Sequence, residues 1–299
     1  MTDITQNNGV HGRSALSRLS TTTFRTLRKL GDEPLGMFGF AILAILVLVA
    51  IFAPLIAPFD PARQALDNAL QPPSWLHLAG TDEFGRDIFS RLVYGTRITI
   101  QTVLSVSVIV GPIGLAIGVM AGFFGGRTDA ILMRATDIVL SFPSLVLALA
   151  FAAAMGAGLG TAIIAISLTA WPPIARLARA EALVVRNTDY VAAARLYGAS
   201  PLRILFLYIA PMCIPSVIVR LTLNMAGIIL TAASLGFLGL GAQPPLPEWG
   251  AMISSGRKFM LDYWWVAVMP GIAILLTSLA FNIAGDTLRD LLDPRHARS

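Results

Sequence analysis

The sequence predicts an all-α polytopic membrane protein with six transmembrane helices. Hydrophobic residues make up 56% of its 299 residues and charged residues only 13%, whereas charged residues account for about 25% of a soluble chain. The apolar residues are gathered into segments of about twenty residues, which is the length that crosses a hydrocarbon core of roughly 30 Å. We expect the spans at residues 35–57, 97–122, 130–155, 160–178, 213–236 and 265–286.

The residues before the first span are expected to form a basic tail. Five cations and no acidic residue occur between residues 11 and 30, together with many serines and threonines. This composition also resembles a transit peptide, which is the alternative interpretation. Segment 35–57 is too long for the apolar core of a signal peptide and has no small-residue cleavage pattern, so we expect it to remain as the first span.

The distribution of cations predicts the orientation, because lysine and arginine favour the cytoplasmic side of a membrane. With the N-terminus inside, fifteen of the 22 cations fall in tails and inner loops and six in outer loops. Both termini are therefore expected in the cytoplasm. The expected organisation is cytoplasmic tails at 1–34 and 287–299, an extracytoplasmic loop at 58–96, and a five-helix core at 97–286 that includes an inner loop at 179–212 and an outer loop at 237–264.

The two outer loops contain dense motifs. The first includes GTDEFGRDIFSRLVYGTR (80–97), and the second includes QPPLPEW (243–249), whose prolines stop any helix. Either a contact with another protein or an internal brace of the outer face would explain such motifs. The candidate residues are Gly80, Thr81, Asp82, Gly85, Arg86, Asp87, Gln243, Pro244, Pro245, Glu248 and Trp249.

The sequence lacks the patterns of the main catalytic and metal-binding classes. It has no GxxxxGK[ST] phosphate-binding loop and no GxSxG nucleophile motif. The three histidines, His11, His77 and His296, are scattered and give no metal-ligand spacing. We therefore predict no catalytic residue and no metal site. The net charge of +5 resides mainly in arginines between the spans, so nucleic acid is not an expected partner.

The inner loop at 179–212 is too long and too charged for a simple connector. Small alanines at 192–194 permit close approach, Gly198 can make a turn, and Ser200 with Pro201 can begin a helix. This spacing resembles the EAA loop of ABC importer permeases, which docks in a groove of the cytoplasmic ATPase. An amphipathic interfacial helix is the alternative. The candidate coupling residues are Ala192, Ala193, Ala194, Arg195, Gly198, Ala199, Ser200, Arg203 and Pro211.

Further motifs narrow the resemblance. The two outer-loop motifs and FNIAGDTLRDLLDPR (281–295) resemble the second permease subunit of dipeptide, oligopeptide and nickel importers. The resemblance implies a type I ABC importer permease fold in the bacterial cytoplasmic membrane, with this chain forming half of a peptide pore that works by alternating access. It also implies a sister permease, two ATPase subunits that bind ATP and Mg, and an extracytoplasmic substrate-binding protein. This chain itself is expected to bind no cofactor and to contact membrane lipid.

One departure from the family pattern concerns the coupling loop. The glutamate of the EAA motif is Ala192 here, so docking could depend instead on Arg195, Arg203 or Glu181. Polar residues within spans are costly in lipid and suggest function. Asn224, Ser278 and Asn282 are therefore candidates for lining the pathway, although hydrogen bonding between helices would also explain them.

Other functions stay open at the level of the sequence. Nickel, glutathione or another small solute could replace peptides as the substrate. A stand-alone secondary transporter would need an ion-coupling site, usually with charged residues near mid-membrane, and acidic residues are missing there. A purely structural membrane subunit is the third possibility.

Overall fold

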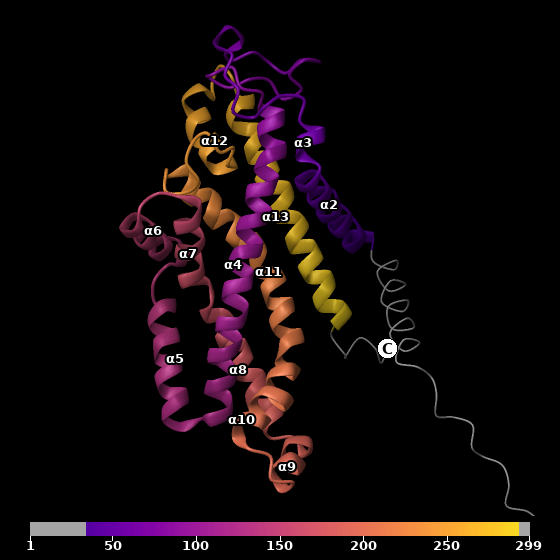
Figure 1. Cartoon of the computed structure of the whole chain (residues 1–299), viewed down its shortest axis with the longest axis vertical. Coiled ribbons are helices and arrows are strands. Elements are labelled where there is room, and N and C mark those ends of the chain that lie inside the picture. Colours follow the sequence, from indigo (N-terminus) through magenta and orange to yellow (C-terminus); the bar gives the residue numbers. More distant parts are fainter. Residues whose placement is uncertain (1–33, 293–299) are drawn as a thin grey trace, which may run out of the picture.

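A computed structural model describes residues 34–292, and the regular elements in this range are helices. The basic tail at 1–33 and the last residues, 293–299, lie outside the described residues. Figure 1 shows an elongated bundle in which α4 (Ile88–Phe124), α11 (Ala210–Phe237) and α13 (Trp265–Leu292) pack against one another. We call the end with the long loops and α12 the outer end, and the end with α9 the inner end.

The first helix, α2 (Pro34–Ile51), packs on the inner half of α13. A Cβ atom on Gly36 would lie 2.5 Å from Thr287 Oγ1, and one on Gly39 would lie 2.6 Å from Ile283 Cγ2. Small residues at such positions let two apolar helices approach closely in a membrane. The short α3 (Ala53–Ile56) then leads into the outer loops, and α2 begins beside the last turns of α13 (Figure 1).

The central helix α4 is longer than a membrane requires. Its 37 residues extend over about 55 Å, and it begins at Ile88 rather than near residue 97, because Asp87 caps it. Part of the expected outer loop is therefore helical. Small residues place α4 directly against its neighbours: Gly114, Gly118 and Gly122 face α8, and Gly111 faces Leu221 of α11.

The expected third span at 130–155 is broken into two helices. α5 (Gly126–Leu140) and α6 (Ser144–Met155) meet at an angle of 88°. Pro143 causes the break, because proline cannot donate to the preceding turn and disfavours helical backbone at the residue before it. Within residues 34–292, five helices are long and apolar enough to cross a membrane, or six if this bent pair counts as one span.

The fourth span extends beyond its expected end at residue 178. α7 (Leu159–Ala170) is followed after Trp171 by α8 (Pro172–Arg186), and the two together form one candidate span. The arginines of α8 lower its hydropathy, yet its apolar face is buried. The inner turn then consists of α9 (Asp189–Leu196) and α10 (Pro201–Ile204), and a π-helical turn, η2 (Leu205–Ile209), joins α10 to α11.

The remaining elements lie at the outer end. They are the short η1 (Leu66–Asn68), α12 (Trp249–Gly256) and η3 (Arg257–Phe259). The hydrophobic core runs along the bundle between α4, α7, α8, α11 and α13, and includes Val103, Val106, Val110, Ile166, Ile174 and Ile229. The long helices therefore connect the two ends of the molecule through one continuous packed interior.

Candidate coupling turn and outer network

Helix α8 is fastened to α5 by two ion pairs. The Arg179 guanidinium binds Asp129 through two hydrogen bonds, of which Nη2 to Oδ2 is 2.6 Å. Arg176 Nη2 donates to Asp137 Oδ1 at 2.6 Å. From their spacing on one helix, Arg134 and Asp137 are expected to pair with each other. That expectation is wrong, since Asp137 pairs with an arginine of the neighbouring helix instead.

The same helix is also fastened to α4 and α11. Arg186 Nη1 donates to the carbonyl oxygens of Gly122 at 3.0 Å and Phe123 at 3.2 Å, which belong to the last turn of α4. A cation is favourable there because the last carbonyl groups of a helix lack partners. Ser216 Oγ of α11 donates to Glu181 Oε1 at 2.9 Å. Glu181 is thus half-buried and bonded within the chain rather than presented at the inner end.

We define the coupling turn as residues 189–204. Helix α9 ends in a Schellman motif, in which the Ala199 N–H donates to Ala194 O at 3.1 Å and the Gly198 N–H donates to Arg195 O at 3.0 Å. Gly198 has φ +78°, the left-handed conformation that this motif requires. Ser200 then caps α10, accepting from the Arg203 N–H at 3.4 Å. The predicted turn at Gly198 and helix start at Ser200 are both present.

The outward face of the coupling turn is strongly exposed. Leu196 is 90% exposed and Tyr197 is 92% exposed, whereas Ala194 and Val191 are buried against the bundle. The sequence analysis missed Leu196 and Tyr197. Their signal is two large apolar residues directly before the glycine of a helix end. The predicted residues that are also exposed are Ala192, Ala193, Arg195, Gly198, Ser200, Arg203 and Pro211, and Ala199 is half-buried.

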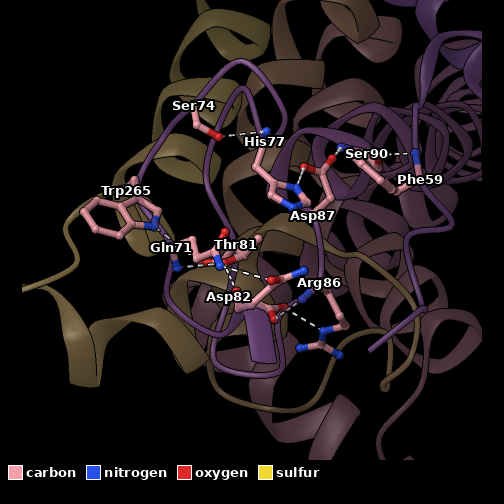
Figure 2. A network of polar contacts seen from close by, with 11 residues as sticks. Phe59, Gln71, Ser74, His77, Thr81, Asp82, Arg86, Asp87, Ser90 and Trp265 are labelled. Carbon is pink, nitrogen blue, oxygen red and sulfur yellow. Dashed lines mark hydrogen bonds and ion pairs between the residues drawn. The ribbon is translucent and has the colours of Figure 1, made fainter. Parts of the chain in front are cut away.

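At the opposite end, the outer network (residues 59–91, with Trp265) is centred on Asp82. Its Oδ1 accepts from the backbone N–H groups of Phe84 at 2.9 Å and Arg86 at 3.0 Å, and its Oδ2 accepts from Arg86 Nε at 2.6 Å (Figure 2). Arg91 Nε lies 3.7 Å from the same Oδ2. All three charged side chains are buried. A buried pair of this kind costs several kcal/mol to break, because the remaining charge is left without compensation.

The second acid of the motif, Asp87, joins three segments. It caps α4 by accepting from the Ser90 N–H at 2.7 Å, and its Oδ1 lies 2.9 Å from His77 Nδ1. Ser90 Oγ in turn accepts from the Phe59 N–H at 3.1 Å, which holds the segment after α3 against α4 (Figure 2). His77 belongs to the scattered histidines that give no metal-ligand spacing, and its contact with Asp87, ten positions away, exists only because the folded loop brings the two together.

Thr81 and the two glycines of the motif fix the path of the loop. Thr81 O accepts from Trp265 Nε1 at 3.3 Å, which ties the loop to the start of α13. Gly80 and Gly85 have φ values of +76° and +69°. A Cβ atom on Gly85 would lie 1.8 Å from the carbonyl oxygen of Ala65. Glycine is therefore required at Gly85 by both the backbone conformation and the available space.

The second outer motif is also an internal brace. Glu248 caps α12 by accepting from the N–H groups of Gly250 at 2.9 Å and Ala251 at 2.7 Å. Burial raises the pKa of its carboxyl above the ordinary value, while these two donors act in the opposite direction. Trp249 Nε1 donates to Leu92 O of α4 at 3.2 Å. Gln243, whose amide caps the preceding loop, and Pro244 and Pro245 remain exposed.

Comparison with known protein families identifies the chain. A family described as "Binding-protein-dependent transport system inner membrane component" matches residues 114–298. The chain belongs to this family. A second match, described as "N-terminal TM domain of oligopeptide transport permease C", covers residues 23–73. The resemblance inferred from the motifs is thereby confirmed, and the protein is a multi-pass component of an inner membrane transport system rather than an enzyme.

Individual relatives agree with this assignment. The chain is 47% identical to the di/tripeptide transport system permease protein DppC of Pseudomonas aeruginosa over 264 residues, covering 86% of this chain and 87% of the relative. It is also 47% identical to the probable D,D-dipeptide transport system permease protein DdpC of Escherichia coli over 266 residues, covering 89% of each. An inward-facing structure of the MetNI methionine ABC transporter shares the fold, with a TM-score of 0.57 and 20% identity, and covers 69% of this chain and 98% of its own. The predicted all-α permease fold is confirmed.

The predicted pathway residues of this transport component lie on two helices that pack together. Asn224 is half-buried on α11, and Asn282 is exposed on α13. Ser278 is buried on α13, and its Oγ has no hydrogen-bond partner within residues 34–292. Their role in transport stays a prediction.

Proposed function

We propose that this chain is one of two permease subunits of an ATP-driven peptide importer. It forms half of a pore through the cytoplasmic membrane, and a sister permease forms the other half. Two ATPase subunits bind ATP and Mg on the cytoplasmic side, and a substrate-binding protein delivers peptide from outside. The names of the relatives support peptides as the substrate class. The exposed coupling turn at the inner end is the observation that supports the ATPase contact.

The contacts of α8 explain how a movement of the coupling turn would be transmitted to the helices that form the pore. The turn follows α8 directly, and α8 is bonded to α4, α5 and α11. A displacement of α9 therefore moves four helices together rather than bending a loop. Binding of ATP would close the ATPase pair and favour one of two helix arrangements of the permease. ATP shifts the equilibrium between these arrangements only to the extent that it binds the transporter more tightly in one of them.

The exposed apolar tip of the turn is the part that we expect the ATPase to bind. Residues that contribute most to an interface are large side chains that become fully buried on binding. Leu196 and Tyr197 fit this description, since they are 90% and 92% exposed in the single chain. Arg195 precedes Leu196 in α9 and Arg203 lies in α10 of the same turn, and both are exposed and would add positive charge to the contact. Shape and apolar contact then replace the glutamate of the EAA pattern.

Substitution of the apolar tip tests this docking role. In transporter reconstituted with its partner subunits, L196S combined with Y197S should lower ATP-driven uptake at least tenfold, on the order of the loss of one hot spot. The matched control is L261S, because Leu261 is 97% exposed at the outer end. Uptake by the double variant at the level of the control would contradict the docking role. Charge reversal at Arg195 and Arg203 measures the contribution of the arginines separately.

The orientation follows from the cation distribution and can be tested with one cysteine at a time. Cys213 is buried, so C213S is the background for new cysteines at Lys258 and Arg195, which are both exposed. In intact spheroplasts, a membrane-impermeant maleimide should label K258C and not R195C. The opposite result would reverse the proposed orientation, in which both termini are cytoplasmic.

Substrate class needs a direct measurement, because nickel, glutathione and other small solutes are the alternatives. Uptake of labelled di- and oligopeptides in a deletion strain should be restored by the chain together with its partners. Uptake of nickel or glutathione in place of peptides would replace the proposed substrate and leave the permease role intact. In the same assay, N224A, S278A and N282A should change the apparent affinity or rate for peptide if these residues line the pathway.

A further inference from the structure

The outer network contains a cavity that none of its structural roles explains. This cavity has a volume of about 160 Å³ and lies beside the pair formed by His77 and Asp87. We call it the outer pocket. The residues that matter for its chemistry are Phe59, Arg63, Asn68, Leu76, His77 and Asp87.

The hydrogen-bonding groups still available in the outer pocket are mainly donors. Both oxygens of Asp87 are already in use, Oδ1 beside His77 and Oδ2 with the Ser90 N–H. The Asn68 amide oxygen accepts from Gln71 Nε2 at 3.0 Å, which leaves its N–H groups available. The exposed guanidinium of Arg63 forms no ion pair with residues 34–292.

These donors define the kind of ligand. A guanidinium presents a fork of N–H groups that matches a carboxylate, and an amide N–H2 can add a further bond. Both oxygens of Asp87 are already engaged, by His77 and by the α4 backbone, which leaves Arg63 and Asn68 as the groups that can bind a carboxylate. The pocket therefore suits an anionic, planar acceptor.

The volume of the outer pocket restricts which kind of molecule can supply a carboxylate to it. Sites for whole small molecules have volumes of roughly 300–1,000 Å³, so 160 Å³ is too small for a peptide and sufficient for one acidic side chain. The loop beside the pocket is apolar and exposed, with Trp75 at 98% and Leu76 at 65%. An exposed tryptophan next to a charged centre is typical of a protein–protein contact.

We propose that the outer pocket binds an aspartate or glutamate side chain of the substrate-binding protein, with Arg63 and Asn68 as the ligating residues. Trp75 and Leu76 would cover the contact from the side. This inference rests on the proposed function, in which the outer end faces the binding protein. It adds to that function the position and the charge of one docking contact.

The decisive variant is N68D, which changes the charge of the pocket and almost nothing else. Aspartate keeps an oxygen that accepts from Gln71 and replaces the available N–H2 group by a second, negatively charged oxygen. In assembled transporter held in nanodiscs, N68D and R63Q should each weaken binding of the purified binding protein about tenfold, as expected for a lost charged contact. The matched control is K258Q, an exposed cation outside the pocket.

The remaining arms separate the possible outcomes. R63E should abolish binding, and one Asp→Arg or Glu→Arg variant of the binding protein should restore it. Binding by N68D and R63Q within about twofold of the wild type would overturn the inference. The inference would also be overturned if the transporter bound dipeptide directly, in the absence of the binding protein, and N68D abolished that binding. The pocket would then recognise the substrate rather than the binding protein. Binding of the purified binding protein is measured directly and without ATP. The result therefore does not depend on whether the transporter takes up the proposed substrate.

Discussion

The coupling turn and the outer network use the same local devices in opposite surroundings. Each has a glycine with positive φ and a polar side chain that caps a helix, at Gly198 and Ser200 in the turn and at Gly85 and Asp87 in the network. In the network, the charged side chains of Asp82, Arg86 and Asp87 find partners within the chain and are buried. In the turn, the large side chains point away from the bundle. Polar loop motifs of similar appearance thus form an internal brace around Asp82 and a contact surface at Leu196 and Tyr197.

The difference has a physical consequence for how each region responds to mutation. A brace contributes to the stability of the chain, because its buried charges and tight contacts cannot rearrange. A contact surface contributes little until a partner covers it. Substitutions of the buried charged residues in the outer network should therefore lower stability, whereas substitutions of the exposed side chains in the coupling turn should lower transport and leave stability nearly unchanged. Variants made in pairs, one in each region, test whether the two regions differ in this way.

The largest effect is expected at Asp82. D82N keeps an oxygen for the backbone donors and removes the charge, so the buried guanidinium groups of Arg86 and Arg91 lose their compensation. Loss of one partner of a buried pair costs about 3–5 kcal/mol. The free energy of unfolding from an SDS titration in mixed micelles measures this loss. A change smaller than about 1 kcal/mol, the range of surface pairs, would mean that the network is not a brace.

The next effect concerns the two glycines with positive φ. G85A should destabilise the chain by about 2–4 kcal/mol, because the added methyl group meets the Ala65 carbonyl and adds backbone strain. G198A has open space around it and should cost only about 1–2 kcal/mol, from the strain alone. SDS titration compares the two variants. Equal losses would show that the surroundings do not distinguish the two turns.

A pH dependence is expected at Glu248. Burial raises its pKa in the folded chain, so the folded state holds this proton at a pH where the unfolded state has released it. Stability should therefore fall as the pH rises from the ordinary glutamate value through the folded one. Unfolding of wild type and E248Q across this range isolates the effect, because the glutamine does not titrate. A wild-type slope equal to that of E248Q would remove Glu248 as its cause.

Local chemistry allowed much of the two regions to be predicted from the sequence. The spacing of Gly198, Ser200 and Pro201 predicts the coupling turn, because each residue favours its own backbone conformation. The roles of His77 and of the exposed Leu196 could not be predicted. They depend on which segments the fold brings together and which way a turn faces, and neither is encoded within a few residues. The break at Pro143 was missed because the average hydropathy of 130–155 conceals one proline.

Ion pairs between helices also could not be predicted from the sequence. The exposed pair between α5 and α8 gives the smallest effect on stability that we expect. Asp137 is paired with Arg176 of α8, but both side chains are more than half exposed. Exposed pairs contribute about 0.2–1 kcal/mol, so D137N should lower the free energy of unfolding by less than 1 kcal/mol, in contrast to D82N. If the ion pairs of α8 matter for coupling, D137N should reduce uptake although it hardly changes stability. The control is R134Q, because Arg134 is a neighbouring arginine that forms no ion pair within residues 34–292. A stability loss for D137N as large as that of D82N would show that the pair is buried in the assembled transporter, where a partner subunit covers it.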